Sequence, residues 1–97
     1  MSKRGEQWTK FSGMVLDHVE NYTVPQYGDF PHDQAEGFSI PDIVLNIRRY
    51  LNRAESNARG RAEAKRDCLK IAHYACLLYL RIEKETPLNE KWAKEFK

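Results

Sequence analysis

The chain has 97 residues, of which 41% are apolar and 31% charged, and a formal net charge of +2 at pH 7. This length fits one domain over residues 1–97, and the apolar content excludes an intrinsically disordered chain. No apolar run approaches the roughly 20 residues of a membrane span and nothing after Met1 resembles a signal peptide, so we expect a cytoplasmic protein that is not inserted in a membrane.

The first expected helix covers residues 6–23 and is followed by a long loop. Apolar side chains recur in it at intervals of three and four, which is the spacing of one helix face: Trp8, Phe11, Val15, Val19 and Tyr22. Prolines and glycines interrupt the pattern over residues 24–41, because proline excludes a continuous helix and glycine favours turns. Three aromatic residues predict that this loop packs onto the helices: Tyr27, Phe30 and Phe38.

A second helix is expected to begin at the sequence SIPD, residues 39–42. Ser39 suits the N-cap, Pro41 the first turn, and Asp42 the positive end of the helix dipole. Its buried side is expected to hold Ile43, Ile47, Tyr50, Leu51 and Ala54. The opposite, polar side carries Asp42, Asn46, Arg49 and Arg53.

Arg49 and Arg53 lie one helical turn apart, and like charges at that spacing are mildly destabilising. An anion between them would relieve the repulsion, because arginine binds phosphate through paired hydrogen bonds. A solubilising helix face is the alternative interpretation.

A third helix is expected from Ala62 to Glu85. Asn57 and Gly60 predict a short turn before it and hence an antiparallel helical hairpin. Pro87 is expected to end it, and a short helix near Leu88–Phe96 to follow. The predicted fold is therefore all-α, with three main helices in a small bundle, a long Pro/Gly-containing loop after the first helix, and a short C-terminal helix.

The apolar arc of the third helix spans roughly 200°, about twice what one neighbouring helix covers. Its centre holds Leu69, Ala72, Cys76, Tyr79 and Leu80. We expect this helix at or near the interface of a homodimer, or of a tetramer. Cys68 and Cys76 are eight residues apart, about 12 Å along a helix, too far for a mutual disulfide, and we expect two buried thiols in a reducing cytoplasm.

The narrow polar side of the third helix holds the candidate reactive groups. Glu63 and Asp67 lie one turn apart and together could hold Mg²⁺, or could form ion pairs on a solvated face, such as Glu63 with Arg66 or Asp67 with Lys70. His73 lies where this side meets the apolar arc, and is either a boundary histidine or a residue that faces a cleft.

Three motifs in sequence order resemble a known family: QYGDF at 26–30, IRRYLNR at 47–53 and RDCLKIAHYACLLYL at 66–80. Together they are similar to the MazG-like all-α nucleoside triphosphate pyrophosphohydrolases, in particular small phage and bacterial members. The resemblance implies a hydrolase that cleaves a nucleotide between its α- and β-phosphates and releases pyrophosphate, with Mg²⁺ held by carboxylates activating water. It also implies that helices of two or more chains join into one bundle.

Carried over to this chain, the resemblance makes Asp67 a metal ligand, with Glu63 as its companion. Asp67, Lys70 and His73 become the candidate catalytic residues. Asp29 in the preceding loop is the further candidate metal ligand.

Arg49 and Arg53 become candidate phosphate-binding residues, and they stand where the family carries its second metal-binding acidic pair. The second helix offers only Asp42 at its start and Glu55 at its end. A hydrolase and a relative that binds nucleotide without cleaving it therefore both remain open. The alternative function is a small basic module that binds nucleic acid or a protein partner, because residues 42–81 carry nine Lys/Arg and four Asp/Glu.

Overall fold

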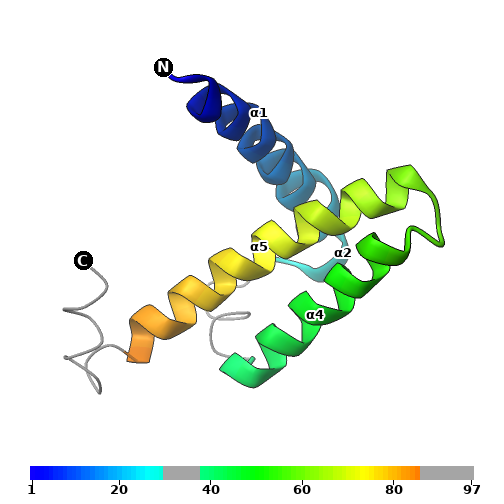
Figure 1. Cartoon of the computed structure of the whole chain (residues 1–97). Helices are drawn as coiled ribbons and strands as arrows, with labels where there is room; N and C mark the ends of the chain where they lie inside the picture. The colour runs from blue at the N-terminus through cyan, green and yellow to red at the C-terminus, as the bar shows by residue number, and fades with distance from the viewer. Residues whose placement is uncertain (30–37, 86–97) are drawn as a thin grey trace.

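The computed structural model describes residues 1–29 and 38–85. Those residues form helices and contain no strand, which confirms an all-α fold (Figure 1). Three helices are long: α1 (Lys3–His18), α4 (Ile40–Ser56) and α5 (Arg61–Glu85). Within the described residues, no helix has the length and apolar content that crossing a membrane requires. Three predicted features lie outside the described residues: the helix near Leu88–Phe96, Pro87 as the residue that ends the third helix, and Phe30 in the loop.

The first helical segment extends further than the sequence pattern predicted. After α1 the chain continues through a π-helical turn, η1 (Val19–Thr23), into the short helix α2 (Val24–Tyr27). We call residues 3–27 the first arm. The prediction that proline excludes helix from residue 24 onward was wrong for residues 24–27, because Pro25 lies in the first turn of α2, where a missing N–H is tolerated, directly after a wider π turn. The arm ends at Gly28, whose φ of 90° favours glycine and whose N–H donates to the Val24 carbonyl at 2.8 Å.

Helix α4 begins where the sequence predicted. Ser39 is the N-cap: its Oγ accepts from the Asp42 backbone N–H at 3.2 Å, and the Asp42 carboxylate accepts from the Ser39 N–H at 3.3 Å. This reciprocal pair is a capping box, which satisfies two backbone donors at once. Ile43 and Tyr50 are buried as expected, whereas Leu51, expected on the same side, is exposed.

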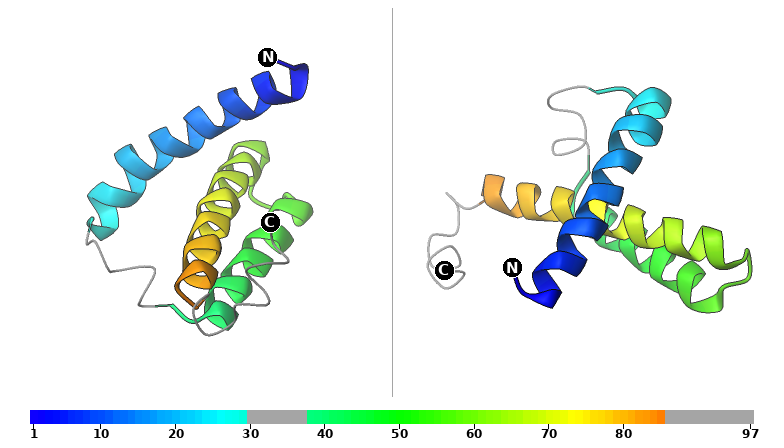
Figure 2. Two further views of the ribbon diagram at one scale, coloured as in Figure 1. Left: turned by 90° about the vertical axis from the view of Figure 1, so that its left-hand side faces the viewer. Right: turned by 90° about the horizontal axis from the view of Figure 1, so that it is seen from above.

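Helices α4 and α5 form an antiparallel pair, residues 40–85, which we call the hairpin (Figure 1). Asn57 and Gly60 make the turn between them with φ values of 50° and 97°, in the left-handed region that these two residue types adopt most readily. The α1 helix crosses α5 at a wide angle and touches it less extensively than α4 does (Figure 2). The arm and the hairpin therefore diverge from their contact, and side chains of both line the space between them.

The side of α5 that is buried against the rest of the molecule differs from the predicted side. Asp67 and Leu77 are buried, while most of the centre of the expected apolar arc is open: Cys76 is exposed, and Tyr79 and Leu80 are 55% and 40% exposed. Cys68, beside this centre, is exposed as well. The two thiols are thus not buried in the single chain. The polar side of α5 packs toward α4 instead, because the arginine stripe of α4 supplies an ionic partner for Asp67 and Tyr50 supplies a ring for Tyr74.

Candidate functional site

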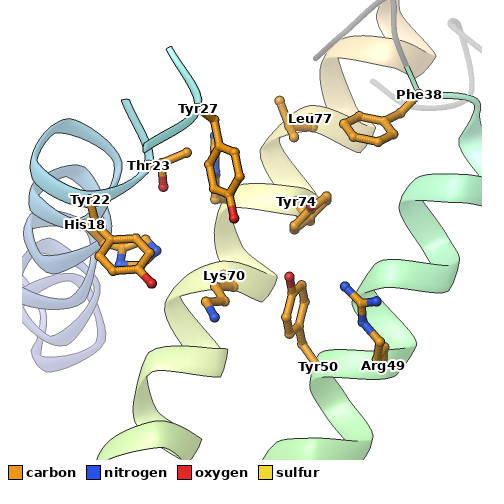
Figure 3. A pocket seen from close by; sticks show the side chains of 11 residues that line it. His18, Tyr22, Thr23, Tyr27, Phe38, Arg49, Tyr50, Lys70, Tyr74 and Leu77 are labelled. Atoms are coloured by element: carbon orange, nitrogen blue, oxygen red, sulfur yellow. The ribbon is translucent and has the colours of Figure 1, made fainter. Parts of the chain in front are cut away.

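A pocket of about 420 Å³ lies between the first arm and the hairpin (Figure 3). The arm contributes His18, Tyr22, Thr23 and Tyr27. The α4 side contributes Phe38, Arg49 and Tyr50, and α5 contributes Lys70, His73, Tyr74 and Leu77. Five of these eleven side chains are tyrosine or phenylalanine rings, two are histidines, and two are the basic residues Arg49 and Lys70. The composition is that of a site with flat apolar walls and a few placed polar groups.

The cations of the pocket gather around one ring. The Arg49 guanidinium lies 5.3 Å and the Lys70 ammonium 5.3 Å from the centre of the Tyr50 ring, within the range of cation–π attraction. Arg49 donates a hydrogen bond to the Asn46 amide oxygen at 3.0 Å. In the described part of the chain neither cation forms an ion pair, and no described lining residue is acidic. This end of the pocket therefore carries uncompensated positive charge.

Arg53 is the third cation on Tyr50, at 5.5 Å, but its charge is already matched. Its Nη2 lies 3.5 Å from Oδ1 of Asp67 on α5, and the two side chains are 30% and 2% exposed. The Asp67 Oδ1 and the Arg53 Nε have no hydrogen-bond partner among the described residues. The pair is thus held mainly by charge, and it leaves Arg49 and Lys70 as the cations that line the pocket without an ionic partner among the described residues.

Aromatic contacts set the shape of the walls. On the hairpin, Tyr74 lies between Tyr50 and Phe38, with ring centres 5.7 Å and 6.4 Å away. On the arm, His18 stacks on Tyr22 with ring centres 5.0 Å apart and an interplanar angle of 18°. Figure 3 shows the hydroxyl ends of Tyr27 and Tyr50 pointing toward the same space from opposite sides. Rings on facing walls at these positions can take a flat ligand group between them.

Burial shifts the pKa values of three side chains that line the pocket. It lowers the pKa of His18, with further lowering by the nearby charges of Lys70 and Arg66 that Asp17 partly offsets. It likewise lowers the pKa of His73, assisted by His18. Burial raises the pKa of the Tyr74 phenol, assisted by the neighbouring Tyr50. At neutral pH both imidazoles are therefore uncharged and can accept as well as donate a hydrogen bond.

Acid is expected to destabilise the protein partly through these two histidines. Their folded-state pKa values lie below the ordinary 6.5, so the unfolded chain takes up protons at higher pH than the folded chain does. Their contribution to stability is complete above about pH 6.5 and falls as the pH drops below it. Urea unfolding across this range should show a weaker acid loss in a His18→Gln/His73→Gln variant than in the unmodified protein. An identical pH dependence in the two proteins would contradict the prediction.

The structure brings together only part of the predicted site. Arg49, Lys70 and His73 line the pocket, while Arg53 and Asp67 form the ion pair beside Tyr50. Asp67 thus forms its ion pair with Arg53 of α4. The alternative expectation, an ion pair between Asp67 and Lys70, was wrong.

The remaining predicted carboxylates lie elsewhere. Glu63 accepts from Arg66 at 2.8 Å, which is the alternative expected for it, and Asp29 is exposed beyond the end of α2. Among the described residues no three His, Cys, Asp or Glu side chains gather in a way that could hold a metal ion. The Mg²⁺ site stays a prediction.

Sequence reasoning missed the arm side of the pocket. The spacing of His18 and Tyr22, one helical turn apart, could have indicated that they act together. Tyr22 was instead assigned to the apolar stripe of the first helix, and His18 lies off that stripe. Tyr50 was assigned to the core and is indeed buried, yet it also supports three cations. Tyr74, between Tyr50 and Phe38, was not among the predicted site residues.

Comparison of the chain with protein-family models, with curated proteins and with solved structures finds no match. The likeness to the pyrophosphohydrolases therefore rests on the three motifs alone.

Proposed function

We propose that the protein binds a nucleotide in the pocket between the first arm and the hairpin. The observation that carries this proposal is the pairing of Arg49 and Lys70, which have no acidic partner among the described residues, with aromatic rings in one pocket of about 420 Å³. A phosphate meets the two cations, and a base meets the rings. Stacking of a base on an aromatic side chain contributes about 1–3 kcal/mol, and hydrogen bonds to charged groups about 1.5–3 kcal/mol.

The positions of the cations and of the rings determine how the nucleotide is oriented in the pocket. Arg49 and Lys70 belong to the hairpin and hold the phosphate beside Tyr50. Tyr22 and Tyr27 belong to the arm and offer their rings to the base. His18 and His73, uncharged at neutral pH, add hydrogen-bond capacity between these two ends without adding charge.

Hydrolysis is the extension of this proposal that the family resemblance supplies. It requires Mg²⁺, for which Asp67 and Glu63 are the candidate ligands, with Asp29 as the third. Each would have to change its present surroundings, since Asp67 is paired with Arg53 and Glu63 with Arg66. Binding and catalysis are therefore separate claims with separate assays.

Calorimetric titration with nucleoside triphosphates and monophosphates, with free nucleoside and with inorganic phosphate tests the binding claim. We expect Arg49→Gln and Lys70→Gln each to weaken nucleotide binding about tenfold, since each loses a charged hydrogen bond. Arg48→Gln is the matched control, because Arg48 and Arg49 are both exposed neighbours on α4 but only Arg49 lines the pocket. Equal losses in Arg48→Gln and Arg49→Gln, or no binding by the unmodified protein, would refute the proposal.

Release of pyrophosphate with Mg²⁺ present tests the catalytic extension. Asp67→Asn should abolish any such activity, because asparagine keeps the shape of the side chain and loses the charge that binds metal. A titration with single-stranded and duplex DNA at two salt concentrations distinguishes the nucleic-acid alternative. Salt-sensitive binding of DNA without binding of mononucleotides would favour that alternative.

We also propose that the protein acts as a homodimer. Within the described residues only three apolar side chains are buried, namely Ile43, Tyr50 and Leu77. Large apolar side chains on both α1 and α5 stay exposed, among them Trp8, Leu16 and Tyr79. Such exposure is costly in water and is commonly relieved by a second copy of the same face.

A further inference from the structure

The outer face of α5 is apolar over its whole middle and charged only at its two ends. We define this face by Lys65, Cys68, Leu69, Ala72, Ala75, Cys76, Tyr79, Leu80 and Glu83. Leu69 and Ala72 are half-buried and the other seven are exposed. The face lies on the opposite side of α5 from Asp67, which is buried toward α4.

The spacing along this face is that of a helix–helix seam. Lys65, Leu69, Ala72, Cys76, Tyr79 and Glu83 follow one another at intervals of four, three, four, three and four residues. This alternation repeats every seven residues and keeps one stripe toward a partner helix over several turns. Its two central members, Ala72 and Cys76, are small, so two such stripes can approach closely.

We propose that the outer face of α5 packs antiparallel against the same face of a second copy, with the two-fold axis level with Tyr74. This proposal rests on the homodimer proposed above and specifies its interface. In this register Ala72 lies opposite Cys76 of the second copy, and Leu69 opposite its Tyr79. Lys65 then lies opposite Glu83 of the second copy, and the two-fold symmetry repeats that pair at the other end.

Charge selects this arrangement over the parallel one. A parallel pair would place Lys65 against Lys65 and Glu83 against Glu83, with like charges at both ends. The antiparallel pair replaces both repulsions by attractions. Neither side chain forms an ion pair in the described part of the chain, so both are available to a second copy.

The seam and the pocket are separate surfaces of α5. Lys70, Tyr74 and Leu77 line the pocket, and none of them belongs to the outer face. A dimer built on this seam carries two pockets that face away from its axis. Loss of the seam and loss of nucleotide binding are therefore distinguishable outcomes.

Charge reversal tests the register. The dimer dissociation constant is measured by sedimentation for the unmodified protein, Lys65→Glu, Glu83→Lys and the double variant. Each single reversal places like charges at both ends and should raise the constant about tenfold. The double variant restores opposite charges and should return the constant to near its original value. An equimolar mixture of the two single variants should form mixed dimers preferentially.

A central substitution tests the close approach. Ala72→Lys introduces a long charged side chain at the middle of the seam and should leave the protein monomeric, while its helical circular dichroism is kept. Ala58→Lys, in the turn between α4 and α5, is the matched control and should dimerise normally.

Two results would overturn the proposal in different ways. If the unmodified protein is monomeric at micromolar concentration while nucleotide binds, self-association is wrong and the pocket proposal stands. If it is dimeric but the two single reversals have no effect, or the double variant fails to restore association, the dimer uses another surface.

Discussion

Replacing Arg53 with methionine is expected to lower the free energy of unfolding by about 3 kcal/mol, the effect of leaving a buried charge without its partner. The Asp67 side chain is 2% exposed, and the Arg53 guanidinium, 3.5 Å away, is its one ion-pair partner among the described residues. Methionine keeps much of the length of the arginine stem and removes the charge. The carboxylate is then left without an opposite charge in a site that water barely reaches.

The two partners of this pair should differ in their effect. Arg53 is 30% exposed, so after Asp67→Asn it can turn toward water, and that variant should be destabilised by much less than Arg53→Met. The Arg53→Met/Asp67→Leu double variant should recover most of the loss, because no buried charge is left. Arg49→Met is the control, since Arg49 has no carboxylate partner in the described part of the chain. Urea unfolding that ranks Arg49→Met equal to Arg53→Met would show that the pair does not stabilise the fold.

Ile43→Ala is expected to cost about 3 kcal/mol of stability, within the range of roughly 2–5 kcal/mol for removing the bulk of a buried isoleucine. Ile43 is completely buried in the first turns of α4, in a core with only two other buried apolar side chains in the described residues. Little neighbouring structure is available to close over the cavity. Losing this side chain therefore removes a large share of what holds the hairpin together.

Leu45→Ala is the matched comparison on the same helix. Leu45 is 66% exposed, so its truncation should change the unfolding free energy by less than about 0.5 kcal/mol. Thermal and urea unfolding of both variants provide the measurement. A loss in Leu45→Ala as large as that in Ile43→Ala would mean that Leu45 is covered, for example by another molecule, and that the buried core extends beyond the single chain.

Features set by neighbouring residues could be predicted from the sequence. The start of α4 depends on Ser39 and Asp42, and its end on Asn57, with Gly60 completing the turn. Each of these residues acts through its own backbone preference or through a hydrogen bond to a residue three positions away in the sequence. The same locality explains why the hairpin was expected in the right place.

The rotation of α5 could not be predicted in this way. Hydropathy alone places the polar side of a helix in water, yet here Asp67 is buried because Arg53 of another helix faces it. Tyr74 packs on Tyr50 for the same reason, since the two residues come from different elements. Matching of two polar faces is a property of the pair of helices and leaves no mark in the periodicity of either one.

The candidate site could likewise be predicted only in part from the sequence. Arg49 could be proposed as an anion-binding residue because it stands on the polar stripe of a predicted helix, and Lys70 as a catalytic residue because the family resemblance covers its position. His18 and Tyr22 could not, since their approach to α5 depends on where the first arm crosses the hairpin. That crossing follows from the packing of the whole chain.

The π turn at Val19–Thr23 links the evolution of the pocket to the number of residues in the first arm. A π turn accommodates one residue more than an α-helical turn of the same rise, and it is the form in which a helix absorbs a single-residue insertion. Deleting one residue there would return the turn to α-helical geometry, while α1 before it and Tyr27 beyond it keep their places, because the wider turn takes up the extra residue. Related chains that lack this residue would share the hairpin, its cations and Tyr27, and would differ within the turn itself, where Tyr22 and Thr23 line the pocket. Ligand preference in such a lineage can diversify through insertion and deletion as readily as through substitution.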